Sequence, residues 1–199
     1  MEFIKKYWGV LGVLVILGIV IISGMNTIPT MDEDVKAKWS QVENQYQRRA
    51  DLIPNIVKTV KGYATHEKST LTDVMNARAN ATKVTVSADN LTDVEAMKKF
   101  EAAQGALSST LGRLMAVQEN YPNLKADTQF IALQSQLEGT ENRISVARKD
   151  YIDAVQQFNT RVRTFPGFIW ASIYGAKPKA SFTASEGSDK APEVNFDSK

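Results

Sequence analysis

Apolar residues form an uninterrupted run near the N-terminus of the chain. No residue between Trp8 and Met31 is charged, and the stretch WGVLGVLVILGIVIISGM is almost wholly apolar. Because a helix rises 1.5 Å per residue, about 20 such residues span the ~30 Å hydrocarbon core of a bilayer. The pattern predicts a transmembrane helix at about residues 8–27, within an N-terminal anchor of residues 1–30.

A cleaved signal peptide is the alternative interpretation of this run. It would need a shorter apolar region followed by an A-x-A-like cleavage site, and SGMNTIP fits such a site only loosely. The favoured interpretation is an uncleaved anchor that crosses the membrane once, since no second run of that length follows. Lys5 and Lys6 lie closer to the run than Lys36 and Lys38, which favours a cytoplasmic N-terminus and an extracytoplasmic domain.

Beyond the anchor, apolar residues recur every three or four positions through residues 31–175, which is typical of amphipathic helices. The first segment begins near Met31, where three acidic residues favour a helix N-terminus, and fades in the turn-rich stretch SADNLTD. The second segment runs from about Val94 to Tyr121, before Pro122, and the third from about Ala126 to Thr164.

These periodicities predict the fold class. No alternating strand pattern persists, so we expect an all-α fold in which an N-terminal transmembrane helix is followed by an elongated antiparallel bundle of long helices. The first segment places on one face Val35, Trp39, Val42, Tyr46, Ile53, Val60, Leu71 and Val74. The second places on one face Met97, Phe100, Ala103, Leu107, Leu111 and Leu114. The third places on one face Phe130, Leu133, Leu137, Thr140, Ile144, Ala147, Tyr151, Ala154, Phe158 and Val162.

The three predicted helices differ in length, at about 75, 42 and 58 Å. The second is too short to cover the other two along their whole length. Part of the first or third helix therefore needs cover from the C-terminal segment, the membrane surface or another copy of the chain. Self-association follows as an expectation.

The stretch GFIWASIYG at residues 167–175 carries bulky side chains outside any long amphipathic pattern, namely Phe168, Ile169, Trp170 and Tyr174. If the third helix runs antiparallel to the first, this stretch returns to the membrane-proximal end, where Trp and Tyr favour the interface. The slightly favoured alternative is a lid that caps the open end of the bundle. Residues 176–199 are rich in small, polar and charged residues and predict a mostly flexible tail, whose Val194 and Phe196 could dock as a short extended piece.

Pro54 interrupts the first segment. It removes the amide that would bond to Ala50, so a continuous helix should kink there. Alternatively, Asp51 caps a new helix with Pro54 in its first turn. The apolar rhythm stays in phase across the proline, which favours a kink over a break.

Heptad spacing puts Arg49 on the buried seam of the first segment, where a charge is costly unless it is paired. An antiparallel third segment would bring Arg49 to Glu141 or Asp150.

By the same pairing, Asp51 would meet Arg143 or Arg148. We therefore predict a polar layer that fixes helix register. Its members are Arg48, Arg49, Asp51, Glu141, Arg143, Arg148 and Asp150. The alternative is a set of solvated surface charges.

Candidate catalytic chemistry is sparse. The chain has no cysteine, which excludes disulfides, thiolate nucleophiles and cysteine-ligated zinc, and its net charge of +2 disfavours a nucleic-acid partner. His66 is the only histidine and has only Glu67 beside it, so neither a metal site nor a catalytic base is expected. GALSSTLGRL lacks the lysine of a phosphate-binding loop, and no Glu-x-x-His repeat is present. We expect no cofactor and no enzymatic activity.

Several motifs together resemble the LemA family of bacteria, over about residues 30–196. They are DLIPN, VKGY, the Tyr-Pro turn, TENRI, AR-x-x-Y and FNT-x-x-R-x-FPG, in addition to the N-terminal anchor. The resemblance implies an N-terminally anchored, mostly helical bundle in a bacterial membrane, hints at membrane organisation, and supplies no catalytic residues. Ile152 stands where the family often has asparagine, which affects only a local polar contact.

The sequence thus predicts a non-enzymatic, single-pass scaffold of the bacterial inner membrane that self-assembles and organises or shapes the membrane. Its expected partners are membrane lipid, further copies of the chain and another membrane protein. The alternative is an adaptor or regulatory partner of a membrane protease, a transporter or an envelope-stress system.

Overall fold

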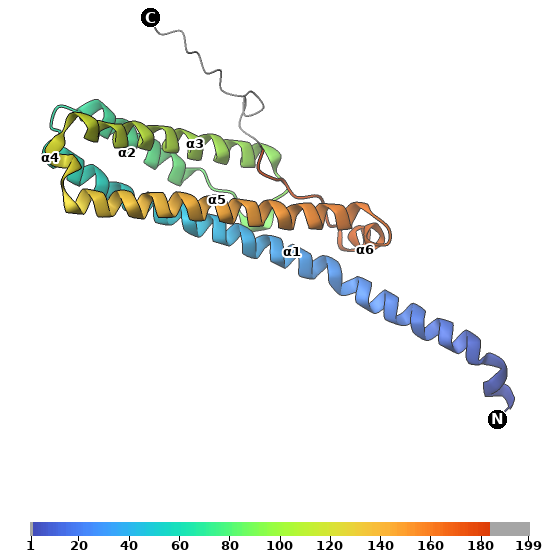
Figure 1. Cartoon of the computed structure of the whole chain (residues 1–199). Coiled ribbons are helices and arrows are strands. Elements are labelled where there is room, and N and C mark those ends of the chain that lie inside the picture. The colour runs from blue at the N-terminus through green and yellow to red at the C-terminus, as the bar shows by residue number, and fades with distance from the viewer. Residues whose placement is uncertain (1, 184–199) are drawn as a thin grey trace, which may run out of the picture.

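A single long helix, α1 (Glu2–Tyr63), forms both the N-terminal stalk, residues 2–23, and one side of the bundle. The computed structural model describes residues 2–183, and the side chains of residues 2–6, 17 and 20–23 lie outside the description. With 62 residues, α1 is about 93 Å long. Figure 1 shows its N-terminal part extending well beyond the rest of the molecule.

The bundle is an up-and-down arrangement in which α1 packs along α5 (Thr128–Arg163) and α2 (Lys68–Lys83) packs along α3 (Val94–Ala116). Short elements connect and complete it: η1 (Ala88–Asn90), η2 (Val117–Asn120), α4 (Pro122–Lys125) and α6 (Gly167–Tyr174). No strand occurs within residues 2–183, so the all-α prediction is confirmed. We call the end of the bundle at α4 the tip and the end at α6 the base.

The second and third predicted helices begin at Val94 and Thr128, and an aspartate side chain caps each of them. The Asp93 carboxylate accepts a hydrogen bond from the Ala96 amide at 2.9 Å, and Asp127 accepts one from Phe130 at 2.7 Å. Both caps satisfy amides that would otherwise lack a partner in the first turn. The apolar faces predicted for these two helices point into the core, with only Leu133 partly exposed.

The prediction of one helix from Met31 to SADNLTD is wrong, because α1 ends at Tyr63 and the chain reverses over residues 64–67 into α2. Ala64 is fully buried in this turn, and its amide still bonds to the Val60 carbonyl. The apolar spacing continues across the reversal to Leu71 of α2. Leu71 packs in the same hydrophobic cluster as Ala64, from the second helix of this helical hairpin. Periodicity alone therefore could not reveal the turn.

This reversal changes the packing expected from helix lengths. α2 lies against both α1 and α3, so the same chain supplies the cover that the three-helix interpretation left missing. Unequal helix lengths therefore give no reason to expect a second copy.

The core of residues 24–183 consists of two hydrophobic clusters along the bundle axis. The base cluster is aromatic: the Trp39 ring lies 5.3 Å from Phe100 and 5.2 Å from Tyr151, between ring centroids, and its indole Nε1 donates to the Val86 carbonyl at 3.0 Å. The tip cluster is mainly aliphatic and centres on Ile53, Leu107, Leu114 and Phe130.

Pro54 lies inside α1, which continues unbroken on both sides, so a new helix does not start at Asp51. The Ala50 carbonyl, deprived of its usual amide by the proline, accepts a hydrogen bond from Arg78 Nε of α2 at 2.7 Å. Pro54 thus creates the acceptor to which α2 attaches.

Among the residues described, no helix contains a stretch both long and apolar enough to cross a membrane. The span expected at about residues 8–27 includes residues 17 and 20–23, whose side chains fall outside the description. The transmembrane helix stays a prediction.

Replacing Arg78 by alanine should lower the free energy of unfolding by about 1–3 kcal/mol, because a buried carbonyl loses its donor. In a chain that already carries Pro54→Ala, the loss caused by Arg78→Ala should be below about 1 kcal/mol, because the alanine amide at that position can bond to the Ala50 carbonyl within the helix. Urea denaturation of the four combinations measures this coupling. Arg113→Ala, which removes an exposed arginine of α3, is the control; equal losses with and without the proline would contradict the assignment.

Candidate functional site

A buried arginine, Arg49, joins the helices at the boundary between the two core clusters. Its side chain is 1% exposed, and Nη1 donates to Glu141 Oε1 at 3.0 Å and to Ser108 Oγ at 2.7 Å. Nη2 donates to the main-chain carbonyl of Gln104, at 3.3 Å, and to its side-chain oxygen. Arg49 therefore links α1 to α3 and to α5.

Gln104 extends this polar layer to the remaining helix. It is 6% exposed, and its Nε2 donates to the Ala81 carbonyl of α2 at 3.3 Å. Thr140, also buried, donates to the Gln136 carbonyl at 2.7 Å and lies at the same level of α5. The layer thus fixes the register of α1, α2, α3 and α5, since a slip of any one helix would leave buried polar groups without partners.

The structure brings together only part of the predicted polar layer. Arg49 meets Glu141, one of its two expected partners, whereas Asp150 lies 3.9 Å from Lys38 instead. Asp51 does not pair with either expected arginine: it is exposed and accepts a hydrogen bond from Gln47, one turn earlier on α1, at 2.8 Å.

The predicted arginines of α5 have other partners. Arg143 is exposed and donates to Gln45 and Thr140. Arg148 donates to the Tyr46 hydroxyl at 3.3 Å and to Glu101 at 3.2 Å. Arg48 is exposed to solvent. The expected pairing of Asp51 fails because Asp51 lies on the outer face of α1, two positions past the seam.

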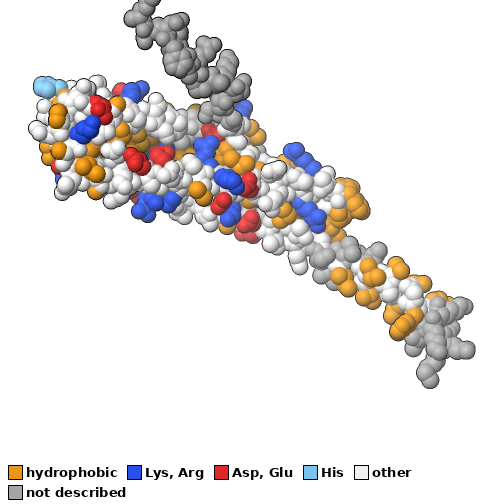
Figure 2. Space-filling view, viewed as in Figure 1, with side chains coloured by type: hydrophobic (Ala, Val, Ile, Leu, Met, Phe, Trp, Pro, Cys, Tyr) orange, Lys and Arg blue, Asp and Glu red, His pale blue; other side chains and the backbone are white. Residues whose placement is uncertain are grey.

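The base of the bundle carries α6, whose inner face is packed and whose outer face is open. Gly167 and Ala171 are buried, while the Trp170 indole lies so close to Gly24 of α1 that a Cβ atom there would clash with it. The exposed side chains around α6 are Phe165 (78%), Phe168 (47%), Ile169 (40%), Ile173 (66%) and Tyr174 (46%). They lie at the end of the bundle from which the stalk emerges (Figures 1 and 2).

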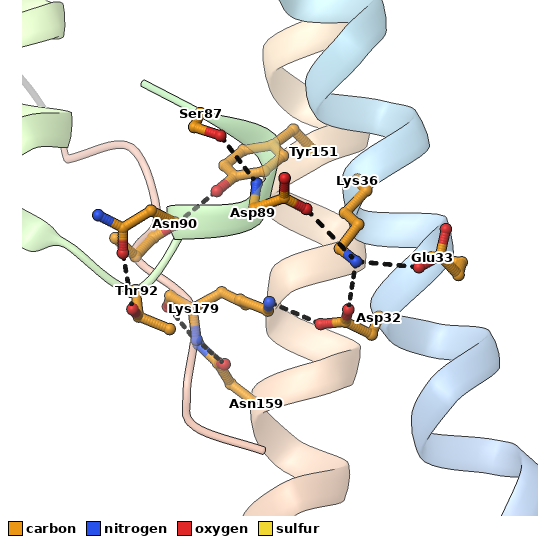
Figure 3. Close-up of polar contacts among 11 residues, drawn as sticks. Asp32, Glu33, Lys36, Ser87, Asp89, Asn90, Thr92, Tyr151, Asn159 and Lys179 are labelled. Carbon is orange, nitrogen blue, oxygen red and sulfur yellow. Dashed lines mark hydrogen bonds and ion pairs between the residues drawn. The ribbon is translucent and has the colours of Figure 1, made fainter. Parts of the chain in front are cut away.

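After α6, residues 176–183 form an extended segment against the bundle, which we call the strap. The composition of these residues predicts a flexible tail, yet Ala180 and Phe182 are buried. Asn159 binds the main chain of Lys179 through two hydrogen bonds (Figure 3). The Asn159 Oδ1 accepts from the Lys179 amide at 2.7 Å, and the Asn159 Nδ2 donates to the Lys179 carbonyl at 2.8 Å. The rest of the predicted tail, 184–199 with Val194 and Phe196, lies outside the described residues.

The strap is also held by charge. Lys179 Nζ lies 2.6 Å from Asp32, and Lys36 approaches the same carboxylate at 3.1 Å (Figure 3). Burial acts to raise the pKa of Asp32, but hydrogen bonds from Lys179 and Lys36 outweigh it and hold that pKa below its ordinary value. Asp32 thus stays ionised as the anchor of the strap.

A family model described as the LemA family matches residues 38–196 of the chain. The chain belongs to the LemA family. The matched region contains the polar layer, α6 and the strap, so these features are part of the family domain rather than additions to it.

Individual relatives agree with this assignment. Magnetosome protein MamQ 2 of Paramagnetospirillum magneticum is 29% identical over 180 residues, covering 82% of this chain and 66% of its own length. Magnetosome protein MamQ of Magnetospirillum gryphiswaldense is 26% identical, covering 76% of this chain and 62% of its own. Protein LemA of Metamycoplasma hominis is 22% identical, covering 92% of this chain and 81% of its own. The chain therefore spans slightly less than two thirds of these MamQ proteins.

Sequence reasoning missed several residues of this LemA-family chain that carry its polar contacts, among them Gln104, Ser108 and Glu101. Gln104 gave a usable signal, because it follows Ala103 on the apolar face of its helix and a polar residue there needs a partner. Glu101 gave none, since its partners Arg148 and Thr183 come from distant segments. His66 is exposed, and no group of metal-ligating side chains occurs among the described residues.

Replacing Arg49 by methionine should lower the free energy of unfolding by about 3–5 kcal/mol, because the buried Gln104 side chain loses its charged partner. Replacing Gln104 by methionine as well should recover most of that loss, since both buried polar groups are then gone.

Chemical denaturation measures both variants. The matched control is Arg48→Ala, one residue along the same helix and exposed, which should change stability by less than about 0.5 kcal/mol. A double variant less stable than Arg49→Met would contradict the coupling of Arg49 and Gln104.

Proposed function

We propose that this LemA-family chain is a non-enzymatic scaffold of the bacterial cell membrane. In this proposal the stalk crosses the bilayer once, α6 rests on the membrane surface beside it, and the bundle projects away. Copies assemble side by side and organise the membrane to which they are anchored.

The stalk carries the proposal, because its described side chains are apolar and open on all sides. The exposed fraction of the residue is between 56% and 72% at Trp8, Val10, Leu11, Val13, Leu14, Val15, Ile16 and Ile19. Full burial of a large aliphatic side chain in an apolar environment is favourable by roughly 1.5–3 kcal/mol relative to exposure to water. A helix that is apolar all round belongs in a membrane or a core, and Figure 2 shows the stalk outside the core of its own bundle.

α6 supports contact with the membrane surface. The open face of α6 exposes both aromatic and aliphatic side chains. Trp170 packs α6 against Gly24, where α1 leaves the bundle. Aromatic residues favour the bilayer interface, which agrees with the aromatic side chains exposed on α6. Of the two roles that the sequence left open, this position favours the membrane-proximal one over a lid.

The orientation follows the basic residues before the stalk. Lys5 and Lys6 precede the apolar run, so the proposal places the N-terminus in the cytoplasm and the bundle outside. The names of the MamQ relatives assign those proteins to the magnetosome. We extend to this chain only a general role in organising a bacterial membrane.

Confinement supports self-assembly. Chains held in one bilayer meet at far higher effective concentration than free chains, so weak contacts between bundles suffice.

The emission of Trp170 should be quenched by brominated lipids when the full chain is reconstituted in vesicles. Replacing Trp8 by phenylalanine leaves only Trp170 and the buried Trp39 to report. The further change Trp170→Phe should abolish the quenching, because Trp39 lies deep in the core. Equal emission from Trp8→Phe chains in brominated and ordinary lipid would contradict the placement of α6.

Particles of full-length chain extracted with its lipid should have protein masses of two or more 22.0 kDa protomers. Leu14→Arg should reduce both the membrane-bound fraction and the oligomers, because an arginine at the bilayer centre costs about 2.5–3.5 kcal/mol. Ser69→Arg, an exposed change near the tip, is the matched control and should leave both unchanged. A strictly monomeric wild type at high membrane density would contradict the scaffold.

A further inference from the structure

A polar groove lies between α3 and α5, and side chains of α1 complete its lining. It forms where α5 packs along α1 while α3 packs along α2, so that side chains join α3 to α5 across it. Arg49 of α1 reaches Ser108 on one side and Glu141 on the other. We propose that this groove, which we call the α3–α5 groove, binds a small organic anion through its carboxylate or phosphate oxygens.

The lining of the α3–α5 groove carries an excess of positive charge. Its three cationic side chains are Arg49, Arg148 and Lys149. The one carboxylate in the lining, that of Glu141, already pairs with Arg49 at 3.0 Å. Glu101 and Asp153 pair with the other two cations, but neither lines the groove. A ligand in the groove therefore meets mainly N–H donors, and acidic oxygens are the acceptors that bind such donors most strongly.

Arg148 is held in position with donors to spare. Its Nη1 donates to the Tyr46 hydroxyl at 3.3 Å and its Nη2 to Glu101 at 3.2 Å. The guanidinium also lies 4.2 Å from the centre of the Phe182 ring. These two hydrogen bonds use two of the five N–H donors that a guanidinium has. An anion can bind the remaining donors at little further cost in side-chain ordering, because the side chain is already fixed.

Two serine hydroxyls add donors from the two sides of the groove, Ser108 from α3 and Ser145 from α5. Ser108 Oγ accepts from Arg49 at 2.7 Å, and its own proton bonds to no other atom of residues 2–183. Over the same residues the Ser145 hydroxyl has no hydrogen-bond partner. A ligand between the two helices would thus find an unused donor on each of them.

The burial of Arg49 gives an electrostatic reason for an anion at this place. The side chain is 1% exposed, and within the described residues its Nε has no hydrogen-bond partner. Its ion-pair partner Glu141 is itself 41% exposed, so water weakens that pair. A second anion in the groove would stabilise the buried cation through space without contacting the Nε, since charges interact strongly where little water surrounds them.

The size of the groove and its apolar residues define the ligand further. The volume is about 460 Å³, which is typical of sites for small molecules. Ile144 and Ile152 line the groove beside the charged groups, so a short carbon skeleton can pack there. None of the lining residues belongs to α6 or to the stalk, so this inference stands or falls independently of the proposed scaffold.

Titrations of full-length chain in detergent micelles, labelled with ¹⁵N-arginine, test the site. The probes are citrate for carboxylates and glycerol 3-phosphate for phosphates, with glycerol as the neutral control, all at constant ionic strength. The Nε–H signal of Arg148, identified by its loss in Arg148→Lys, should shift and saturate at millimolar concentrations of at least one anion. The signal of Arg113, an exposed arginine of α3 outside the groove, should stay in place.

The anion that saturates tells which kind of acidic oxygen the groove prefers. No saturable shift with either anion, an equal shift with glycerol, or an equal shift at Arg113 would overturn the proposal.

A matched pair of variants locates the binding. Ser145→Glu puts a carboxylate into the groove and should weaken the binding by about tenfold or more, because the new charge repels the ligand and occupies its donors. Val146→Glu makes a similar change one residue along α5, at a position that is 61% exposed and outside the groove. It should alter the affinity by less than about twofold. An unchanged Arg113 signal shows that both variants fold, and equal affinity of Ser145→Glu and the natural chain would place the anion elsewhere and refute the site.

Discussion

The buried guanidinium of Arg49 is the constraint on which the packing of the bundle depends. Removing a cation from water costs several kcal/mol, which is tolerable only where the surrounding helices supply partners. Glu141, Ser108 and Gln104 supply partners for Nη1 and Nη2 from two other helices, while the buried Nε has none, and Gln104 also bonds to α2. A slip of α1 by one turn would move the charge by 5.4 Å and strand it among apolar side chains.

On either side of this layer the molecule has different properties. The tip cluster is mainly aliphatic, and a hydrogen bond of 2.7 Å from the Tyr63 hydroxyl of α1 to Asp127 at the start of α5 lies at the same end. The base cluster is aromatic and is completed by distant parts of the chain, because the strap inserts Phe182 against Trp39. The same end carries α6 and the stalk. The surfaces that could meet a membrane are thus gathered at the end whose core the C-terminal segment completes.

Local rules predicted much of this architecture. The apolar faces of α3 and α5 follow from spacing, and heptad phase predicted a buried Arg49 with Glu141 as one of its two expected partners. Two features could not be predicted from the sequence, and each has a physical reason. The reversal at Ala64 preserves the apolar rhythm, so the periodicity did not reveal the turn. The strap is held through its main chain and so leaves little trace in its residue types, apart from Phe182 and Lys179.

The continuity of α1 couples its N-terminal part mechanically to the bundle. No loop interrupts the helix from Glu2 to Tyr63, and Trp170 braces it against α6 at Gly24. A helix advances about 100° and 1.5 Å for each residue. The number of residues between the apolar run and Ile28, the first hydrophobic core position, therefore sets the rotation of the bundle about the helix axis relative to that run. Inserting one residue there would rotate the bundle by about 100° relative to the apolar run and would carry Gly24 away from Trp170.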